Sequence, residues 1–192
     1  TRLRVAFAEG VSSWQVYKAL SEIKFLSGKL ENIPDEGTIA PASYDFVIGM
    51  TKEALIKKMQ ERQASILNEA WNARQPNLPI NTKQEALILA SIIEKETSLK
   101  TERGKVSSVF VNRLLREIAL QTDASVIYGI TRGKKVLGRG LRRSELKKDT
   151  PWNTYVNKGL PPSPIGNPGK ASIHAALNPD ITNYLYFVAD GS

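Results

Sequence analysis

The segment Ala86-Leu87-Ile88-Leu89-Ala90-Ser91-Ile92-Ile93 constrains the fold of this chain more than any other stretch of its sequence. A helix that is apolar around its whole circumference is normally buried in the core, where neighbouring elements cover it on every side. Thr82 and Glu85 stand ahead of this segment at the spacing of a capping box, which is a signature of a helix start. The sequence therefore predicts a buried helix from Thr82 to Glu96 or Thr97.

This predicted helix ends in two carboxylates, Glu94 and Glu96. At about 100° per residue their side chains point roughly 200° apart, so they do not form a pair that shares one proton. Glu96 continues the stripe formed by Ala86, Leu89 and Ile93. Desolvation there should raise the pKa of its carboxyl group, which suits a general acid near neutral pH. The alternative is an ordinary helix-end residue paired with Lys100 at the (i, i+4) spacing.

Composition excludes several classes of protein. A chain of 192 residues with 41% hydrophobic and 24% charged residues is not a disordered tail, a collagen-like repeat or a coiled-coil rod. The absence of cysteine excludes disulfides, zinc ribbons, iron–sulfur clusters and thiol nucleophiles, and one histidine, His174, cannot build a His-rich metal cage. No apolar run approaches the roughly 18 residues that span a bilayer. We therefore predict no metal and no cofactor.

The remaining pattern predicts an α+β fold, in which a helical part packs with a small, mostly antiparallel sheet and long Pro/Gly-rich loops. We expect strands at 2–8 and 184–189, and helices at 12–25, 51–74, 101–116 and 170–177. Residues 31–44 are predicted to form a loop. Two prolines at 75–81 indicate a seam, so we divide the chain into an N-terminal part, 1–80, and a catalytic core, 81–192.

Positive charge is concentrated in one segment. Residues 131–148 hold eight Lys or Arg and one acidic residue, Glu145, and so carry +7 of the net charge of +8. Such a segment is either a docking surface for a polyanion or a solvated basic loop.

Three polar, aromatic segments follow the apolar helix, at 120–129, 152–155 and 159–169. Aromatic, amide and hydroxyl groups on stiff loops suit the binding of a sugar, because rings stack on its apolar faces and amides bond its hydroxyl groups. Turn chemistry combined with core aromatics is the alternative explanation.

A set of motifs in fixed order makes the chain resemble the endolytic murein transglycosylase (YceG-like) family. The resemblance covers about residues 81–191. Its motifs are Ala90-Ser91-Ile92-Ile93-Glu94-Lys95-Glu96-Thr97, Glu102-Arg103, Val109-Phe110-Val111-Asn112-Arg113-Leu114, Leu120-Gln121-Thr122-Asp123, Val126-Ile127-Tyr128-Gly129, Asn153-Thr154-Tyr155, Gly159-Leu160-Pro161-Pro162, Asn167-Pro168-Gly169 and Tyr184-Leu185-Tyr186-Phe187-Val188-Ala189.

The resemblance implies that Glu96 is the catalytic residue of a lyase that cleaves the MurNAc–GlcNAc bond of nascent peptidoglycan without water. The muramyl C6 hydroxyl would attack its own anomeric carbon and leave a 1,6-anhydro end. The expected sugar-binding residues are Gln121, Thr122, Tyr128, Asn153 and Tyr155. The residues expected to orient the site are Glu94, Asp123 and Arg113.

The resemblance also implies features outside this sequence. We expect an N-terminal transmembrane helix and a LysM-like segment, location on the outer side of the bacterial inner membrane, peptidoglycan synthases as partners, and a role in ending glycan elongation. Ala40-Pro41-Ala42-Ser43 replaces the family's aromatic-Pro-Asp-Thr element, and the sequence stops before a Gly-x-His-x-Phe strand. We therefore expect an incomplete wall of the active site.

Two other functions remain as alternatives. A PLP-dependent lyase of the aminodeoxychorismate lyase kind would need a Schiff-base lysine such as Lys83 or Lys95 beside a phosphate cup, and no such cup is evident. A nucleic-acid-binding module could rest on the basic segment, but no known reading motif accompanies it, so we expect no nucleic-acid partner.

Overall fold

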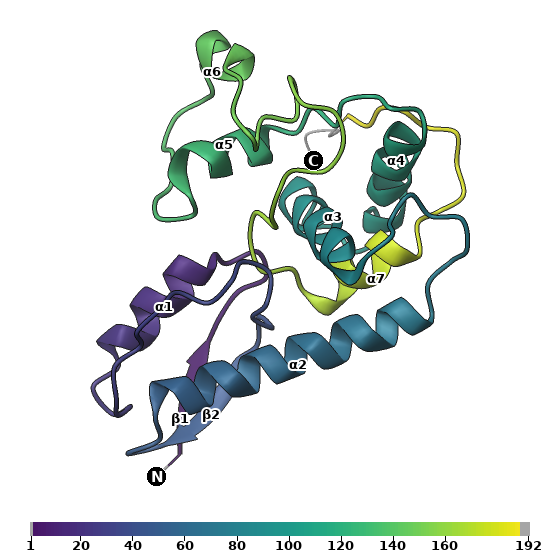
Figure 1. Cartoon of the computed structure of the whole chain (residues 1–192). Helices are drawn as coiled ribbons and strands as arrows, with labels where there is room; N and C mark the ends of the chain where they lie inside the picture. Colours follow the sequence, from purple (N-terminus) through teal and green to yellow (C-terminus); the bar gives the residue numbers. More distant parts are fainter. Residues whose placement is uncertain (1, 189–192) are drawn as a thin grey trace.

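The computed structural model describes residues 2–188, and within them it contains seven helices and one two-stranded sheet (Figure 1). The elements in chain order are β1 (Arg2–Ala6), α1 (Ser13–Glu22), β2 (Ser43–Val47), α2 (Lys52–Asn72), α3 (Lys83–Glu96), α4 (Arg103–Leu115), α5 (Asp123–Thr131), α6 (Arg143–Lys147) and α7 (Lys170–Leu177). This arrangement confirms the predicted α+β class.

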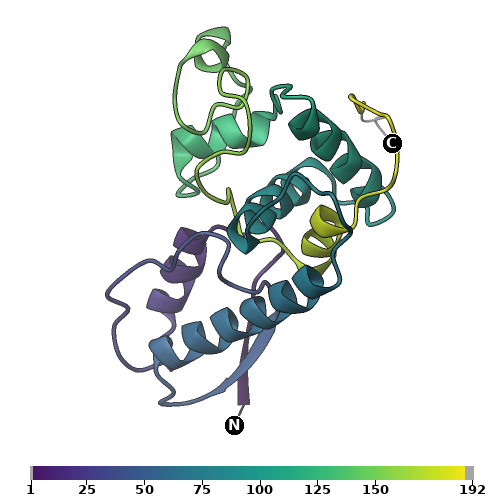
Figure 2. The same cartoon turned by 45° about the vertical axis from the view of Figure 1, so that its right-hand side comes forward.

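The molecule has two lobes, and the larger one consists of α3, α4, α7 and the C-terminal half of α2 (Figures 1 and 2). Helix α3 lies at its centre and contacts the other three helices. Every residue from 86 to 93 is buried, as the apolar run predicts. The polar member of the run, Ser91, is satisfied within the core, since its hydroxyl donates to the Ile88 carbonyl at 2.7 Å and accepts from the Ile165 amide at 3.0 Å. Full burial of each Leu or Ile stabilises the fold by about 1.5–3 kcal/mol.

Two hydrophobic clusters divide the described residues. The first joins α1, the 26–39 region, β2 and the start of α2, and the second joins the end of α2 with α3, α4 and α7. Helix α2 contributes to both, with Met59 in the first cluster and Leu67 in the second. One straight helix therefore links the lobes (Figure 1). The division of the chain at residue 80 stays a prediction.

The sheet corrects one prediction. Strand β1 pairs antiparallel with β2, so that Leu3 lies opposite Phe46 and Val5 opposite Tyr44. We predicted a loop over 31–44 and no strand after it. The alternation of buried Tyr44 and Phe46 with exposed neighbours covers five residues beside a Pro/Gly-rich stretch, and it becomes a strand because β1 supplies its hydrogen-bonding partner.

Three further predictions differ from the structure. Helices α5 and α6 were not predicted, because their short sequences lie among Gly, Lys and Arg residues. The predicted strand at 184–189 is not a strand over 184–188, and Ala189 lies outside the described residues. Side chains of α4 replace a neighbouring strand there: the Asn112 amide donates to the Tyr184 carbonyl at 2.9 Å, and Arg113 Nε donates to the Leu185 carbonyl at 2.7 Å.

The two lobes are tied together beside the end of α3 by a buried amide. Asn167 is fully buried, and its side chain donates to the Val11 carbonyl at 3.0 Å and accepts from the Ile39 amide at 2.9 Å. The backbone carbonyl of Asn167 also accepts a hydrogen bond from the Gly10 N–H at 2.8 Å. The N-terminal lobe therefore has a fixed position relative to α3.

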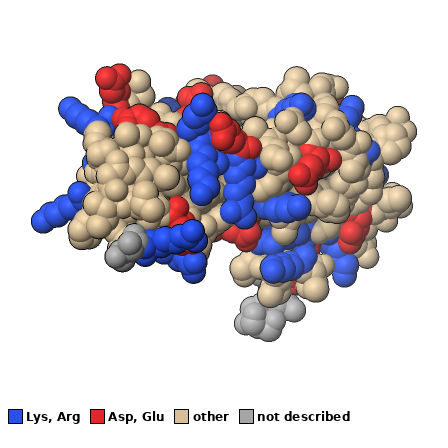
Figure 3. Space-filling model, turned by 90° about the horizontal axis from the view of Figure 1, so that it is seen from below, with Lys and Arg blue, Asp and Glu red and all other residues tan. Residues whose placement is uncertain are grey.

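The face in Figure 3 shows Lys and Arg side chains together with Asp and Glu side chains. None of the helices in the described part of the chain has the length and hydropathy needed to span a bilayer.

Candidate active site

Glu96 is the last residue of α3, and its half-buried carboxyl group accepts a hydrogen bond at Oε1 from the hydroxyl of Thr122. Burial raises the pKa of Glu96, and the nearby Asp123 charge raises it further, whereas the Thr122 hydrogen bond lowers it. Within residues 2–188, Glu96 makes no ion pair with Lys100. The simple helix-end interpretation therefore does not describe this side chain.

Two cavities meet at Glu96. The first has a volume of about 240 Å³ and also contains Arg113, Gln121, Thr122, Asp123 and Tyr155. The second has a volume of about 370 Å³ and runs between α4 and the extended segment that includes Tyr184 and Tyr186. Phe187 lines both cavities and packs edge-on against Phe110 with 5.7 Å between ring centroids. A long ligand could therefore pass Glu96 with its two halves in different cavities.

A tight turn brings Thr122 to Glu96. Gln121 has a φ of 54°, in the left-handed region that few residues other than glycine occupy. Its N–H donates to the Thr154 carbonyl at 3.1 Å, and the Thr122 N–H donates to the Thr154 hydroxyl at 3.0 Å. The strained turn is thus held from both sides, and it directs the Thr122 hydroxyl at the carboxyl group of Glu96.

Arg113 supports the same turn from α4. Its side chain is buried, and its Nη1 donates to the carbonyl groups of Ala119 at 3.2 Å and Leu120 at 2.8 Å. Because Arg113 Nε also holds the Leu185 carbonyl, this one guanidinium group connects the walls of both cavities. Arg113 therefore holds the backbone on both sides of Glu96.

Asp123 and Tyr155 form a second pair in the first cavity. The Tyr155 hydroxyl donates to Asp123 Oδ1 at 2.6 Å. Burial and the hydrogen bond to Asp123 raise the pKa of Tyr155 to about 12, so its hydroxyl keeps its proton over the physiological range. The pair therefore presents a carboxyl group and a neutral phenol beside Glu96.

Glu94 points away from this site, as the helical geometry predicts. Its side chain is 5% exposed, and Oε1 contacts Arg103 Nη2 at 3.0 Å while Oε2 accepts from the Gly169 N–H at 2.9 Å. Gly169 is the N-cap of α7, so Glu94 joins the ends of three helices. Glu94 lines neither of the two Glu96 cavities.

Two of the expected sugar-binding residues lie elsewhere. Asn153 has no exposed surface, and its amide donates to the carbonyl groups of Glu145, Leu146 and Lys148 at 3.3, 3.0 and 2.8 Å. It has no atom left for a sugar and instead fixes the end of α6. Tyr128 is outside both Glu96 cavities, and its hydroxyl donates to Glu36 Oε2 at 3.0 Å.

The sequence analysis missed several residues of the cavities. Phe110 and Leu120 form the apolar floor of the first cavity, and Tyr184 and Tyr186 line the second. The aromatic residues of 184–188 are evident in the sequence, but their pattern predicts a strand and not the wall of a cavity. Arg103 stands in the sequence only as part of a motif, because its ion pair with Glu94, nine residues earlier, depends on the packing of α3 with α4.

No group of three or more His, Cys, Asp or Glu side chains is arranged to hold a metal ion within residues 2–188. The chemistry that the described residues offer is acid–base chemistry by one partly desolvated carboxyl group that lines two cavities.

The sequence and the fold are those of a known class of protein. The sequence profile of the YceG-like family matches residues 1–192, and this chain belongs to that family. A crystal structure of a yceG-like protein from Listeria monocytogenes superposes with a TM-score of 0.78 at 28% identity, covering 99% of this chain and 71% of that one.

Relatives of the chain carry a functional name. A Bacillus subtilis (strain 168) protein named endolytic murein transglycosylase is 40% identical over 157 residues, which are 81% of this chain and 42% of that protein. A Streptococcus pneumoniae (strain D39) protein of the same name is 34% identical over 161 residues, covering 81% of this chain and 28% of that protein. The chain thus spans less than half the length of these relatives.

Proposed function

We propose that this chain is the catalytic part of an endolytic murein transglycosylase, a lyase that cuts the MurNAc–GlcNAc bond within peptidoglycan strands. The observation that carries the proposal is the position of Glu96 where two cavities meet. Cleavage inside a polymer requires binding sites on both sides of the broken bond. The names of the relatives from Bacillus and Streptococcus support the same activity.

The first chemical step is protonation of the leaving oxygen by Glu96. A carboxyl group whose pKa is raised by burial retains its proton closer to neutral pH than an exposed one. The Thr122 hydroxyl donates to Oε1, which leaves Oε2 to carry the acidic proton. As the C1–O4 bond breaks, the proton moves to O4 and Glu96 becomes a carboxylate.

The second step closes the sugar on itself. The muramyl C6 hydroxyl bonds to its own C1, and its proton returns to Glu96. A 1,6-anhydroMurNAc end is formed, no water is consumed, and the enzyme regains its starting protonation state. The Asp123 carboxylate, in the same cavity, is placed to stabilise the positive charge of an oxocarbenium-like transition state.

The two cavities suit a glycan strand in different ways. Tyr184 and Tyr186 are 58% and 74% exposed, so their rings are available to stack on sugar faces in the second cavity. Gln121, Tyr155 and the Thr122 turn offer polar groups in the first. We assign Gln121, Thr122 and Tyr155 to sugar binding, and Asn153 and Arg113 to positioning.

Hydrolysis is the second candidate reaction, and Asp123 is the observation that favours it. Glu96 and Asp123 line the same cavity. Ordinary glycosidases use two carboxyl groups, one as the acid and the other as nucleophile or base. The hydrogen bond from Tyr155 occupies Oδ1 of Asp123. We assign Asp123 an electrostatic role for this reason, and the products distinguish the two reactions.

The wider role includes parts that lie outside this sequence. We propose that the whole protein is held at the bacterial inner membrane with this part on its outer side, that it works beside peptidoglycan synthases, and that its cuts end the elongation of glycan strands. These assignments follow from the family resemblance.

The deciding experiment is digestion of uncrosslinked glycan strands by the full-length protein, with products identified by mass spectrometry. We expect anhydro-ended fragments of several lengths, and their loss by at least about 10³-fold in Glu96→Gln. Glu22→Gln is the matched control, because Glu22 is an exposed residue of α1 and lines neither Glu96 cavity. Reducing ends would show a hydrolase, and unchanged cleavage by Glu96→Gln would overturn the assignment.

The PLP-lyase alternative has less support. Lys83 is exposed at the start of α3, where its Nζ bonds Asn68 Oδ1 at 2.6 Å, and this is not the enclosed site of a Schiff-base lysine. Incubation of the full-length protein with PLP should give no new absorbance band, and appearance of one would revive this alternative.

A further inference from the structure

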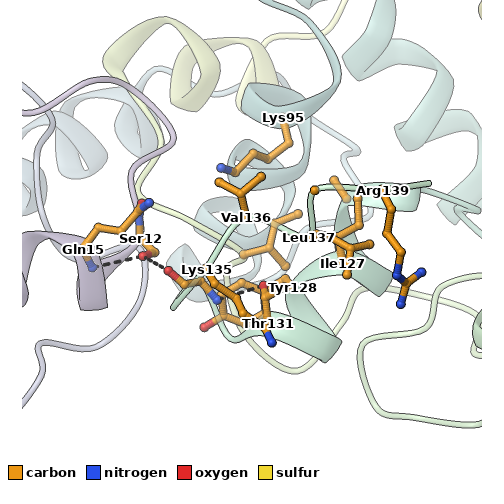
Figure 4. Close-up of a pocket in the computed structure, with 14 residues that line it drawn as sticks. Ser12, Gln15, Lys95, Ile127, Tyr128, Thr131, Lys135, Val136, Leu137 and Arg139 are labelled. Carbon is orange, nitrogen blue, oxygen red and sulfur yellow. Dashed lines mark hydrogen bonds between the residues drawn. The ribbon is translucent and has the colours of Figure 1, made fainter. Parts of the chain in front are cut away.

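A third cavity is lined by Lys95 and by Ala124, Ile127, Tyr128 and Thr131 of α5 (Figure 4). Its volume of about 420 Å³ is within the range of sites that bind small ligands, about 300–1,000 Å³. Its walls come from the start of α1, the end of α3, one face of α5 and the segment 133–139. We call it the Lys95 cavity.

Three cations and several apolar side chains line the Lys95 cavity. Lys95 enters it from α3, and Lys135 and Arg139 come from the basic segment, with Val136 and Leu137 between them (Figure 4). No Asp or Glu is among the residues that line it. A ligand that fits such a cavity is anionic and carries small apolar groups.

The charges near the cavity are only partly neutralised. Arg139 is paired with Glu145, at 2.6 and 2.9 Å. The charges of Glu36 and Glu94 both act on Lys95. Glu36 is half-buried and already accepts hydrogen bonds from the Ser13 N–H and the Tyr128 hydroxyl. Glu94 is already bonded to Arg103 and to the Gly169 N–H. Within residues 2–188, neither Lys95 nor Lys135 forms an ion pair. Both therefore remain available to an incoming anion.

The Lys95 cavity and the candidate active site share two elements. Lys95 and Glu96 are consecutive residues, whose Cα atoms are about 3.8 Å apart. Helix α5 presents Asp123 to the first Glu96 cavity and Ala124 and Tyr128 to the Lys95 cavity. A substituent on a sugar bound at Glu96 therefore has a second cavity within reach.

We propose that the Lys95 cavity binds the stem peptide of the murein strand through the free carboxylates of that peptide. This inference rests on the proposed function. The muramyl sugar that supplies the C6 hydroxyl also carries the peptide on its lactyl group, so one residue of the polymer occupies both sites. Alanyl methyl groups of the peptide match Val136 and Leu137, and its carboxylates match Lys95 and Lys135.

The proposal assigns two residues of the basic segment, 131–148, to binding of the stem peptide. Lys135 and Arg139 belong to it and line the cavity, whereas Lys147 and Lys148 are exposed on α6 and beyond, away from the cavity. A site formed by particular residues predicts that Lys135 matters and Lys147 does not. A diffuse positive surface predicts that both matter equally.

Binding of two matched probes to the full-length protein tests the proposal. The probes are N-acetylmuramyl-L-alanyl-D-glutamate and its diamide, which differ in charge but hardly in size, and titration calorimetry measures their Kd. We expect the diacid to bind at least about tenfold more tightly, as loss of charge-assisted hydrogen bonds implies. Equal affinity for the two probes would overturn the proposal.

Variants locate the site. Lys135→Gln and Lys95→Met should each weaken diacid binding by about tenfold and leave diamide binding unchanged, and Lys147→Gln is the control for charge alone. Lys135 is exposed, so its replacement leaves the fold intact. Equal losses in Lys135→Gln and Lys147→Gln would show diffuse attraction and contradict a built site.

Cleavage separates this inference from the proposed function. We expect strands stripped of peptides to have a KM about tenfold higher than peptide-bearing strands, and Lys135→Gln to remove that difference. Absence of all cleavage, with discrimination between the probes intact, would overturn the proposed function alone. Cleavage that ignores the peptides, without discrimination between the probes, would overturn the peptide site alone.

Discussion

Glu94 and Glu96 are two residues apart on one helix, yet their carboxyl groups lie in opposite electrostatic surroundings. Glu94 contacts the Arg103 guanidinium group at 3.0 Å and receives a backbone N–H at 2.9 Å. Glu96 has a hydroxyl donor, Thr122, and the repulsive charge of Asp123. One glutamate thereby joins parts of the fold, and the pKa of the other is raised.

The first prediction concerns the stability of the Glu94 site. Glu94→Gln should lower the free energy of unfolding by about 3–5 kcal/mol, because the buried Arg103 loses its closest carboxylate partner. Urea denaturation measures the effect, and Glu22→Gln, an exposed change at the end of α1, is the control. A loss below about 1 kcal/mol would mean that the pair is not important for the fold.

The second prediction is that Glu96→Gln changes stability in a pH-dependent way. The folded-state pKa of Glu96 is raised, so the folded protein binds more protons than the unfolded chain between the two pKa values. Wild-type stability therefore falls as the pH rises through the folded-state pKa, and the variant lacks this contribution. Relative to wild type, Glu96→Gln should be more stable at pH 8 than at pH 4. Urea denaturation at both pH values measures the difference, and a constant difference would contradict the raised pKa.

The third prediction is a shift of the pH profile in Asp123→Asn. Removal of the Asp123 charge lowers the pKa of Glu96, so the protonated acid is lost at lower pH. The basic limb of kcat/KM should move to lower pH, while the asparagine carbonyl still accepts from Tyr155. Asp45→Asn, on β2 in the other lobe, should leave the profile in place. An unchanged basic limb would show that Asp123 does not influence the pKa of Glu96.

The fourth prediction compares two replacements of Thr122. Thr122→Val keeps the shape but removes the hydroxyl that donates to Glu96, so the pKa of Glu96 should rise and the basic limb should move to higher pH. Loss of a hydrogen bond to a charged group should also reduce kcat/KM by about tenfold or more. Thr122→Ser keeps the donor and should retain both properties. Equal activity of the two variants would exclude a role for this hydroxyl.

The starts of two helices and the burial of α3 follow from local sequence. The capping boxes at Ser12 and Thr82 are both formed, and they begin α1 and α3 as predicted. The apolar run of α3 is buried along its whole length. These features depend on residues within one or two turns of each other, so the sequence contains all the information that they need.

The elements that the sequence does not predict depend on hydrogen-bonding partners that are distant in the chain. Strand β2 exists through pairing with β1, about forty residues away, and the extended segment at 184–188 is held by Asn112 and Arg113, 72 residues away. Short segments such as these have too few residues for a periodic pattern. Their conformation is decided by which backbone groups find a partner in the folded chain.

The sequence by itself determined that one glutamate must lie at the end of a buried helix, because the spacing of apolar residues fixes which face of a helix is covered. Only the tertiary structure decided which side chains surround that glutamate. Thr122 reaches it from 26 residues away, and Asp123 is held by Tyr155 from 32 residues away. Contacts of this range depend on how the helices and loops pack, and no local pattern encodes them.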